Sequence, residues 1–194
     1  MASVDAEPAP RRRGRGGRYG LIALVAIVAV VLDQLSKAWA VSRLSPEGTE
    51  GIHLVGDLRL KLAFNSGMAF SQGQGKGFII GIVACVIVGG LLWFARTVED
   101  WPSRFAIGLV VGGAIGNVVD RIFRAGIPGV PRGALGGRVV DFIYTGWFPT
   151  FNIADSCVVV GGILLALLTL RAPPERDEAP SADPIPARSD DGGQ

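Results

Sequence analysis

Histidine and cysteine are almost absent from this 194-residue chain, which has one histidine and two cysteines. No C-x-x-C or H-E-x-x-H pattern occurs, so nothing in the sequence points to a redox dithiol or a zinc peptidase. Cys85 and Cys157 lie in apolar segments, where cysteine is more often a packing residue than half of a disulfide. His53 lies outside those segments, so an intramembrane serine–histidine pair is excluded. The remaining candidates are carboxylates, and no metal or organic cofactor is indicated.

Charged residues are scarce within long parts of the chain. The overall mean hydropathy is +0.41 and 49% of the residues are hydrophobic, which is too apolar for an ordinary soluble domain. A membrane-spanning helix needs about 20 largely apolar residues. Four blocks approach that length: Leu21–Val41, Gly77–Ala95, Phe105–Val119 extended past Arg121, and Ile153–Leu170. We therefore predict an all-α polytopic membrane protein with four transmembrane helices.

Basic residues crowd the N-terminal side of the first block, at positions 11, 12, 13, 15 and 18. Positive charge beside a span favours the cytoplasmic side, so both chain ends are expected in the cytoplasm after four spans. The arginine–glycine composition superficially resembles an RNA-binding segment, but beside a span it indicates an anchor, and no nucleic-acid partner is expected. The predicted organisation is a disordered tail at 1–19, a membrane domain at 20–171 and a disordered tail at 172–194, with outer loops at 42–76 and 122–152.

The first apolar block also has the features of a cleavable signal peptide, with a basic start and an A-x-A pattern at Ala38-Trp39-Ala40. However, Asp33 and Lys37 interrupt the apolar region before that pattern, and cleavage would leave an odd number of spans. We expect the block to be retained as a transmembrane helix.

Two further patterns concern local structure. Residues 52–62 alternate between apolar and polar around Gly56-Asp57, which predicts a small hairpin or sheet at the outer membrane surface. In the third block glycines recur every four residues, at Gly108, Gly112 and Gly116. Small residues at this spacing allow helices to approach closely, so they indicate packing more than ligand binding.

The predicted topology brings polar residues from separate spans to one depth. Asp33 lies in the outer half of the first span, Asn117 and Arg121 end the third, and Asp155 begins the fourth. Asp141 precedes it in the outer loop. An acid within a membrane span is a functional-site hypothesis by default, because burying it is costly unless it is paired, hydrated or protonated. The convergence of these residues near the outer leaflet is the stronger indication.

Several of these residues have alternative explanations. Asp33 and Lys37 are four residues apart on one helix face, where an ion pair offsets the cost of burying either charge. Arg121 could pair with Asp120 or Asp33, or it could face the lipid headgroups and substrate. Asp33, Lys37 and Asp120 could equally be polar groups that only support packing.

Asp141 and Asp155 differ from the others because no nearby cation in the sequence obviously neutralises them. Two adjacent carboxylates cannot both ionise easily, so they share a proton and supply a general base and a general acid together. The ionised member would take a proton from water, which attacks a peptide carbonyl, while the protonated member supports the developing oxygen. This pattern predicts an aspartyl protease.

Intramembrane acids also mark proton relays, so a proton-coupled carrier is the main alternative. Carriers commonly show internal repeats and sites near the bilayer midplane, whereas this chain has no visible repeat and its acids cluster at outer ends. A helix-dimerising assembly protein would explain the glycine spacing but not Asp155.

Four ordered motifs identify a family resemblance: Asp33-Gln-Leu-Ser-Lys37, Phe64-Asn65-Ser-Gly-Met-Ala-Phe-Ser71, Gly112-Gly-Ala-Ile-Gly-Asn-Val-Val-Asp-Arg121, and Val139-Val-Asp-Phe142 followed by Phe151-Asn-Ile-Ala-Asp155. With these four motifs, the chain resembles bacterial lipoprotein signal peptidase (signal peptidase II) over roughly residues 20–171. The resemblance implies a bacterial inner-membrane endopeptidase that cleaves diacylglyceryl-modified prolipoproteins just before the lipidated cysteine. It also implies inhibition by globomycin-type peptides and contact with membrane lipids.

The resemblance implies roles for individual residues. Asp141 and Asp155 correspond to the catalytic aspartates, and the residues expected to shape the site or bind substrate are Asn65, Asn117, Arg121, Asn152, Asp33 and Lys37. The stretch from Ile122 to Arg138 looks longer than the corresponding link in the family, where an element near this point closes over the substrate. The resemblance therefore predicts the catalytic pair but not the shape of that lid.

Overall fold

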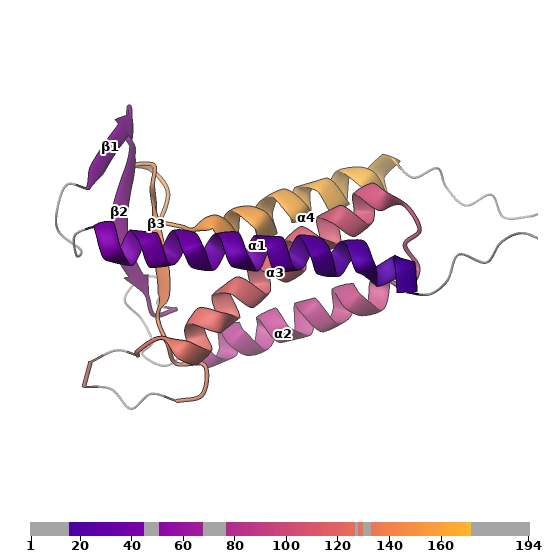
Figure 1. Ribbon diagram of the computed structural model, residues 1–194, viewed down its shortest axis with the longest axis horizontal. Helices are drawn as coiled ribbons and strands as arrows, with labels where there is room; N and C mark the ends of the chain where they lie inside the picture. Colours follow the sequence, from indigo (N-terminus) through magenta and orange to yellow (C-terminus); the bar gives the residue numbers. More distant parts are fainter. Residues whose placement is uncertain (1–15, 45–50, 68–76, 127, 130–132, 172–194) are drawn as a thin grey trace, which may run out of the picture.

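The computed structural model describes residues 16–44, 51–67, 77–126, 128–129 and 133–171. These ranges form the elements α1 (Gly16–Arg43), β1 (Ile52–Val55), β2 (Leu58–Asn65), α2 (Gly77–Phe94), α3 (Trp101–Phe123), β3 (Val139–Tyr144) and α4 (Ile153–Arg171). The helices lie along the long axis of the molecule and the sheet lies at one end of the bundle (Figure 1). Successive helices run in alternating directions, so α1 ends and α4 begins at the end that carries the sheet.

Among the described residues, three helices are long and apolar enough to cross a membrane: Tyr19–Arg43, Trp101–Phe123 and Ile153–Arg171. The apolar stretch of α2, Phe78–Phe94, is shorter. The protein is thus a mostly helical, multi-pass membrane protein with a small three-stranded sheet. The expected fourth span, at 77–95, stays a prediction.

The boundary of the predicted N-terminal tail is wrong by a few residues. Helix α1 begins at Gly16, so residues 16–19 belong to the helix and not to the tail. The apolar block starts later than the helix because glycine, arginine and tyrosine precede it. The rest of the two predicted tails lies outside the described residues.

Helix α3 begins at Trp101, earlier than the predicted start at Phe105. The Asp100 side chain accepts a hydrogen bond of 2.8 Å from the backbone N–H of Ser103, which caps the helix, and Pro102 occupies the first turn. Hydropathy alone misses this start because the capping turn is polar.

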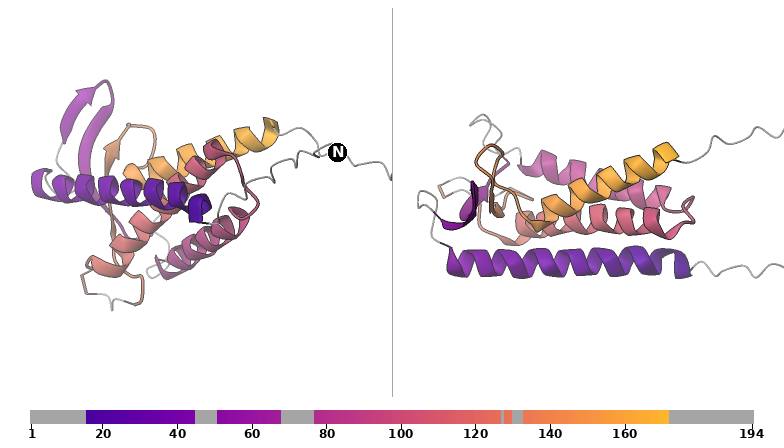
Figure 2. Two further views of the ribbon diagram at one scale, coloured as in Figure 1. Left: turned by 45° about the vertical axis from the view of Figure 1, so that its right-hand side comes forward. Right: turned by 90° about the horizontal axis from the view of Figure 1, so that it is seen from above.

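Helix α3 is the centre of the bundle, since it contacts the other three helices (Figure 2). Its glycines allow this contact. A Cβ atom at Gly112 would lie 2.8 Å from the carbonyl oxygen of Ala26 on α1. A Cβ atom at Gly116 would lie 2.7 Å from a carboxylate oxygen of Asp33. The predicted role of this glycine spacing in close helix packing is therefore confirmed at both positions.

The three strands form one antiparallel sheet in the order β1–β2–β3. The predicted hairpin is confirmed, because β1 pairs with β2 around a turn at Gly56-Asp57. Gly56 has a φ of 53°, a left-handed conformation that glycine adopts without strain. All four residues of β1 are exposed, whereas β2 lies between the other two strands.

Strand β3 lies in the stretch 122–152, for which the sequence predicts an outer loop and not a strand. Val139, Val140, Asp141 and Phe142 are all buried, so both faces of the strand are covered. A strand that is buried on both faces does not show alternating polarity. Asp141 is consequently held by a sheet, opposite Ala63 of β2, and not by a loop.

The close approach of α1 and α3 predicts a difference between two glycine substitutions. Gly112→Ala should destabilise the protein by about 1–3 kcal/mol, because its methyl group would collide with the backbone of α1. Gly162→Ala in α4 is the matched control, since a Cβ atom there would meet nothing within 4 Å. Thermal unfolding in detergent should show a lower midpoint for Gly112→Ala only. Equal midpoints would contradict this packing.

Candidate functional site

The site lies where the sheet meets the beginning of α4. Asp141 extends from β3 and is 2% exposed, while Asp155 lies in the first turn of α4 and is partly buried. Asp141 is placed by the register of the sheet, with Val139 of β3 opposite Asn65 of β2. The two acids therefore come from different kinds of secondary structure that meet at one point.

Asn152 joins the two aspartates. Its side-chain Nδ2 donates to Asp141 Oδ1 at 2.6 Å, and its backbone N–H donates to Asp155 Oδ2 at 3.1 Å. In return, Asn152 Oδ1 accepts from the backbone N–H of Asp155 at 2.9 Å. This reciprocal pair caps the N-terminus of α4, as in a capping box. One residue thus starts the helix and orients both carboxyl groups.

Asn117 of α3 makes the second connection. Its Nδ2 donates to Asp155 Oδ1 at 2.8 Å, and its Oδ1 accepts from Lys37 Nζ at 2.9 Å and from Asn152 Nδ2 at 3.2 Å. The fixed acceptor on the Lys37 side forces the amide NH₂ to face Asp155. Asp155 therefore accepts hydrogen bonds on both of its oxygens.

Asp141 is held in an environment that favours its protonated form. Burial, followed by the negative charge of Asp155, raises the pKa of Asp141 from its ordinary 3.8 to about 7. Hydrogen bonds from Asn65 and Asn152 and the positive charge of Lys37 act in the opposite direction. An acid with a pKa near neutrality can hold and release a proton at physiological pH.

A buried ionic cluster lies directly behind the pair. Lys37 Nζ lies 2.8 Å from Asp33 Oδ2 and 3.0 Å from Asp120 Oδ2, and the three side chains are at most 1% exposed. The expected pairing of Asp33 with Lys37 is therefore present. Asp120 is also bound by Arg124, with 2.6 Å between Nε and Oδ1.

Arg121 is buried but is not the arginine of that cluster. The sequence leaves open that Arg121 pairs with Asp120, but in the structure Arg124 makes that ion pair. Arg121 lies within electrostatic reach of Asp141, Asp120 and Asp155, and its Nη1 has no hydrogen-bond partner among the described residues. Its side chain lines a cavity.

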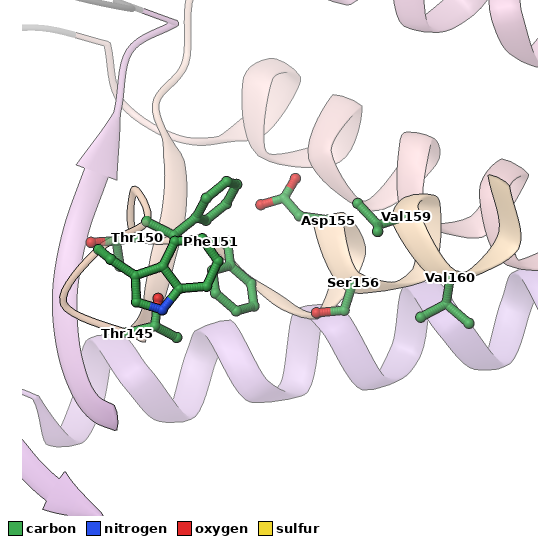
Figure 3. Close-up of a pocket in the computed structure, with 9 residues that line it drawn as sticks. Thr145, Thr150, Phe151, Asp155, Ser156, Val159 and Val160 are labelled. Atoms are coloured by element: carbon green, nitrogen blue, oxygen red, sulfur yellow. The ribbon is translucent and has the colours of Figure 1, made fainter. Parts of the chain in front are cut away.

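Two cavities meet at Asp155. One, of about 700 Å³, lies between α2, α3 and α4 and is lined by Asn65, Asn117, Arg121 and Asp155 together with apolar side chains. The other, of about 520 Å³, is formed by α4 and the loop at 145–151 and is almost entirely apolar. The carboxyl group of Asp155 points from α4 toward the ring of Phe151 in this second cavity (Figure 3).

The structure brings together all eight residues that the sequence proposed: Asp33, Lys37, Asn65, Asn117, Arg121, Asp141, Asn152 and Asp155. It adds Gln34, whose amide donates to Asp33 Oδ2 at 3.0 Å, and Arg124. The four-residue spacing of Asp120 and Arg124 was visible in the sequence and indicates a helical ion pair. Nothing comparable marks Gln34.

Comparisons with known proteins agree with this site. A family model described as signal peptidase (SPase) II matches residues 25–171. The lipoprotein signal peptidase of Rhodococcus jostii (strain RHA1) is 44% identical over 139 residues, covering 71% of this chain and 66% of that protein. The lipoprotein signal peptidase of Mycolicibacterium smegmatis is 41% identical over 161 residues, covering 78% and 65%. The chain thus spans about two thirds of the length of these relatives.

A solved structure, described as a bacterial membrane enzyme determined by the in meso method at 1.9 Å resolution, has a TM-score of 0.66 and 28% sequence identity. The match covers 79% of this chain and 95% of that one. A second structure under the same description, at 2.3 Å, gives the same TM-score and identity. The arrangement of helices and sheet is therefore shared with a solved membrane enzyme.

The raised pKa of Asp141 predicts a pH-dependent stability. Because the folded protein holds this proton at a pH where the unfolded chain has lost it, stability should fall as pH rises from about 4 to about 7. Asp141→Asn cannot titrate, so the thermal midpoint of the wild type relative to this variant should decrease over that range. Asp57→Asn, at the exposed hairpin turn, is the control and should keep the wild-type dependence. A constant difference between wild type and Asp141→Asn would contradict the raised pKa.

Proposed function

This chain belongs to the signal peptidase II family, and we propose that it removes signal peptides from diacylglyceryl-modified prolipoproteins with Asp141 and Asp155 as its catalytic pair. One observation carries this proposal. The two aspartates converge from β3 and α4 and are joined through the side chain and backbone of Asn152. This arrangement provides two carboxyl groups that interact electrostatically and differ in how deeply they are buried.

The pair supports acid–base hydrolysis of a peptide bond. Asp155, as the ionised member, takes a proton from water, whose oxygen attacks the scissile carbonyl carbon. Asp141 gives its proton to the carbonyl oxygen, which yields a neutral tetrahedral intermediate. Asp155 then protonates the leaving nitrogen, the C–N bond breaks, and Asp141 recovers a proton from the intermediate's hydroxyl group. Both carboxyl groups end the cycle as they began.

The assignment of the proton follows from the environments of the two acids. Asp141 is the more deeply buried, and its raised pKa favours the acid form. Asp155 lines both cavities, so water and substrate can reach it. Asp155 therefore suits the role of base and Asp141 that of acid.

The larger cavity suits the peptide part of the substrate. Arg121, Asn65 and Asn117 line this cavity together. A peptide carbonyl that lies there could accept hydrogen bonds from the guanidinium and amide groups of these side chains. We assign Arg121, Asn65 and Asn117 to positioning of the peptide backbone next to the aspartates.

The smaller cavity suits the lipid part. Trp147, Phe148 and Phe151 form a chain of edge-to-face ring contacts, with centroids 5.7 Å and 6.0 Å apart. All three rings line the cavity together with Val159 and Val160 of α4. Because the scissile bond adjoins the lipidated cysteine, the acyl chains of the substrate must lie close to the catalytic pair. This cavity begins at Asp155 and offers an apolar path for it.

We further propose that α2 is a fourth span, so that the protein crosses the bacterial inner membrane four times with both termini cytoplasmic. A helix of 18 residues is about 27 Å long, close to the hydrocarbon thickness of about 30 Å. The arginines preceding α1 favour a cytoplasmic N-terminus. The sheet end of the bundle, with the aspartates, then lies near the outer leaflet, where water can reach them.

The central prediction is loss of cleavage without loss of fold. Asp141→Asn and Asp155→Asn should each lower kcat by at least about 100-fold on a diacylglyceryl lipobox peptide, because an amide cannot exchange the catalytic proton. Purified protein in detergent, with thermal midpoint and circular dichroism as folding controls, provides the measurement. Globomycin should block the wild type. Near-wild-type turnover in either variant would remove that aspartate from the mechanism.

The lipid assignment predicts a change in KM. Val160→Trp should fill the smaller cavity and raise KM for the diacylglyceryl peptide about tenfold, since displacing two methylenes at about 0.8 kcal/mol each has that effect. Leu167→Trp is a matched control on the same helix, because Leu167 is 48% exposed, Val160 is 50% exposed, and only Val160 lines the cavity. If both variants keep the wild-type KM, the acyl chain lies elsewhere.

A further inference from the structure

The buried ionic cluster makes the same contact twice. Asp33 Oδ1 accepts a hydrogen bond from the backbone N–H of Ala154 at 3.0 Å. Asp120 Oδ2 accepts one from the backbone N–H of Val140 at 3.1 Å. Lys37 Nζ lies between these two carboxylates, at 2.8 Å from Asp33 and 3.0 Å from Asp120.

Each of these backbone N–H groups belongs to the residue directly before a proposed catalytic aspartate. Ala154 precedes Asp155, and Val140 precedes Asp141. Both preceding residues are 0% exposed. The cluster therefore hydrogen-bonds to the main chain next to each aspartate but does not contact either catalytic carboxyl group.

The contact with α4 uses a group that the helix itself leaves free. The first N–H groups of a helix have no partner within it, and Ala154 lies in the first turn of α4. The acceptor for this N–H group is the side chain of Asp33, which belongs to α1. The start of α4 is thus fixed by two caps, one local at Asn152 and one from a separate helix.

We propose that Lys37, Asp33 and Asp120 are positioning residues that set the separation of Asp141 and Asp155. This inference rests on the proposed function of that pair. Lys37 binds both carboxylates. Asp120 in turn binds the backbone of β3, and Asp33 binds the backbone of α4. A third connection runs from Lys37 through Asn117 to Asp155 Oδ1.

The cluster is suited to this role because it is stiff. Its ions are fully buried, so each must keep its partner, and breaking one pair leaves an uncompensated charge. Lys37 and Arg124 balance the charges of Asp33 and Asp120. A catalytic misplacement of about 1 Å can reduce a rate by about 100-fold, so a rigid link between the two aspartates has direct value.

A matched pair of substitutions separates this positioning from charge. Asp33→Asn loses the ion pair with Lys37 but keeps an oxygen for the Ala154 N–H, whereas Asp33→Ala loses both. On a diacylglyceryl lipobox peptide, we expect kcat to fall several-fold for Asn, which loses only the Lys37 contact, and at least about tenfold further for Ala, which also loses the Ala154 contact, with KM unchanged. In Asp120, Oδ2 binds both the Val140 N–H and Lys37, so Asp120→Asn can keep both contacts, and its kcat should fall much less than that of Asp120→Ala. Equal kcat within each pair would overturn the proposal.

Arg124→Gln is the control for loss of charge at the same site. It removes a 2.6 Å ion pair from Asp120, but through Oδ1, whereas Oδ2 holds the Val140 N–H. Arg124 is 28% exposed and touches neither backbone N–H group. Because Arg124 is partly exposed and binds the other oxygen of Asp120, its kcat should fall clearly less than that of Asp120→Ala. A loss as large as that of Asp120→Ala would overturn the proposal, because charge alone would then explain it.

If the alanine variants do not fold, the charge-balanced double variant Asp33→Asn with Lys37→Met provides the test. It keeps an acceptor for the Ala154 N–H but removes the contacts of Lys37 with residue 33, Asp120 and Asn117, so kcat should fall at least about tenfold. The positive charge of Lys37 holds the pKa of Asp141 down, so the alkaline limb of kcat/KM should also move to higher pH. Asp155 and Arg121, which also act on Asp141, are unchanged. Wild-type kcat and pH limb would overturn the proposal.

The outcomes distinguish this inference from the proposed function. If the wild type does not cleave the peptide, or if Asp141→Asn still cleaves it, the proposed function fails. If the wild type cleaves, Asp141→Asn does not, and the alanine variants at Asp33 and Asp120 keep wild-type kcat, only the positioning role fails.

Discussion

The ammonium group of Lys37, held between two buried carboxylates, is the contact on which the rest of the site depends. Lys37 and Asp33 lie on α1 and Asp120 lies on α3, so their ion pairs require one relative position of these helices. An ion left unpaired at this depth would be strongly unfavourable. The same carboxylates also bind the backbone of β3 and α4. A single charge cluster therefore connects four elements of the fold.

The small residues of α3 make room for this cluster. A side chain at Gly116 would occupy the space of the Asp33 carboxylate, since a Cβ atom would lie 2.7 Å from its Oδ2. Gly112, one turn earlier, lets the backbone of α1 approach within the same distance range. In a membrane, where apolar contact with lipid competes with contact between helices, such close packing is a main source of association. The glycine spacing thus serves both the bundle and the site.

The two aspartates lie at a junction between a sheet and a helix. Asp141 is held by strand pairing and Asp155 by the capped first turn of α4, and both supports are backbone structures with little freedom. The side chains between them, Asn117 and Asn152, are neutral amides that donate to one group while accepting from another. Amides can orient two carboxyl groups without adding a charge that would fix their protonation.

Sequence alone determined the class of the protein, its apolar helices, the hairpin around Gly56-Asp57 and the set of residues that gather at the site. The class, the helices and the hairpin follow from composition and periodicity, which are local properties, whereas the full set of site residues follows from the resemblance to a known family that four short motifs carry. Only the tertiary structure decided that Asp141 belongs to a strand, that Arg124 and not Arg121 pairs with Asp120, and that the two carboxylates beside Lys37 grip the backbone next to the aspartates. The reason is physical. A strand buried on both faces carries no alternating signal, and a hydrogen bond to a backbone N–H group leaves no mark on the identity of the residue that donates it.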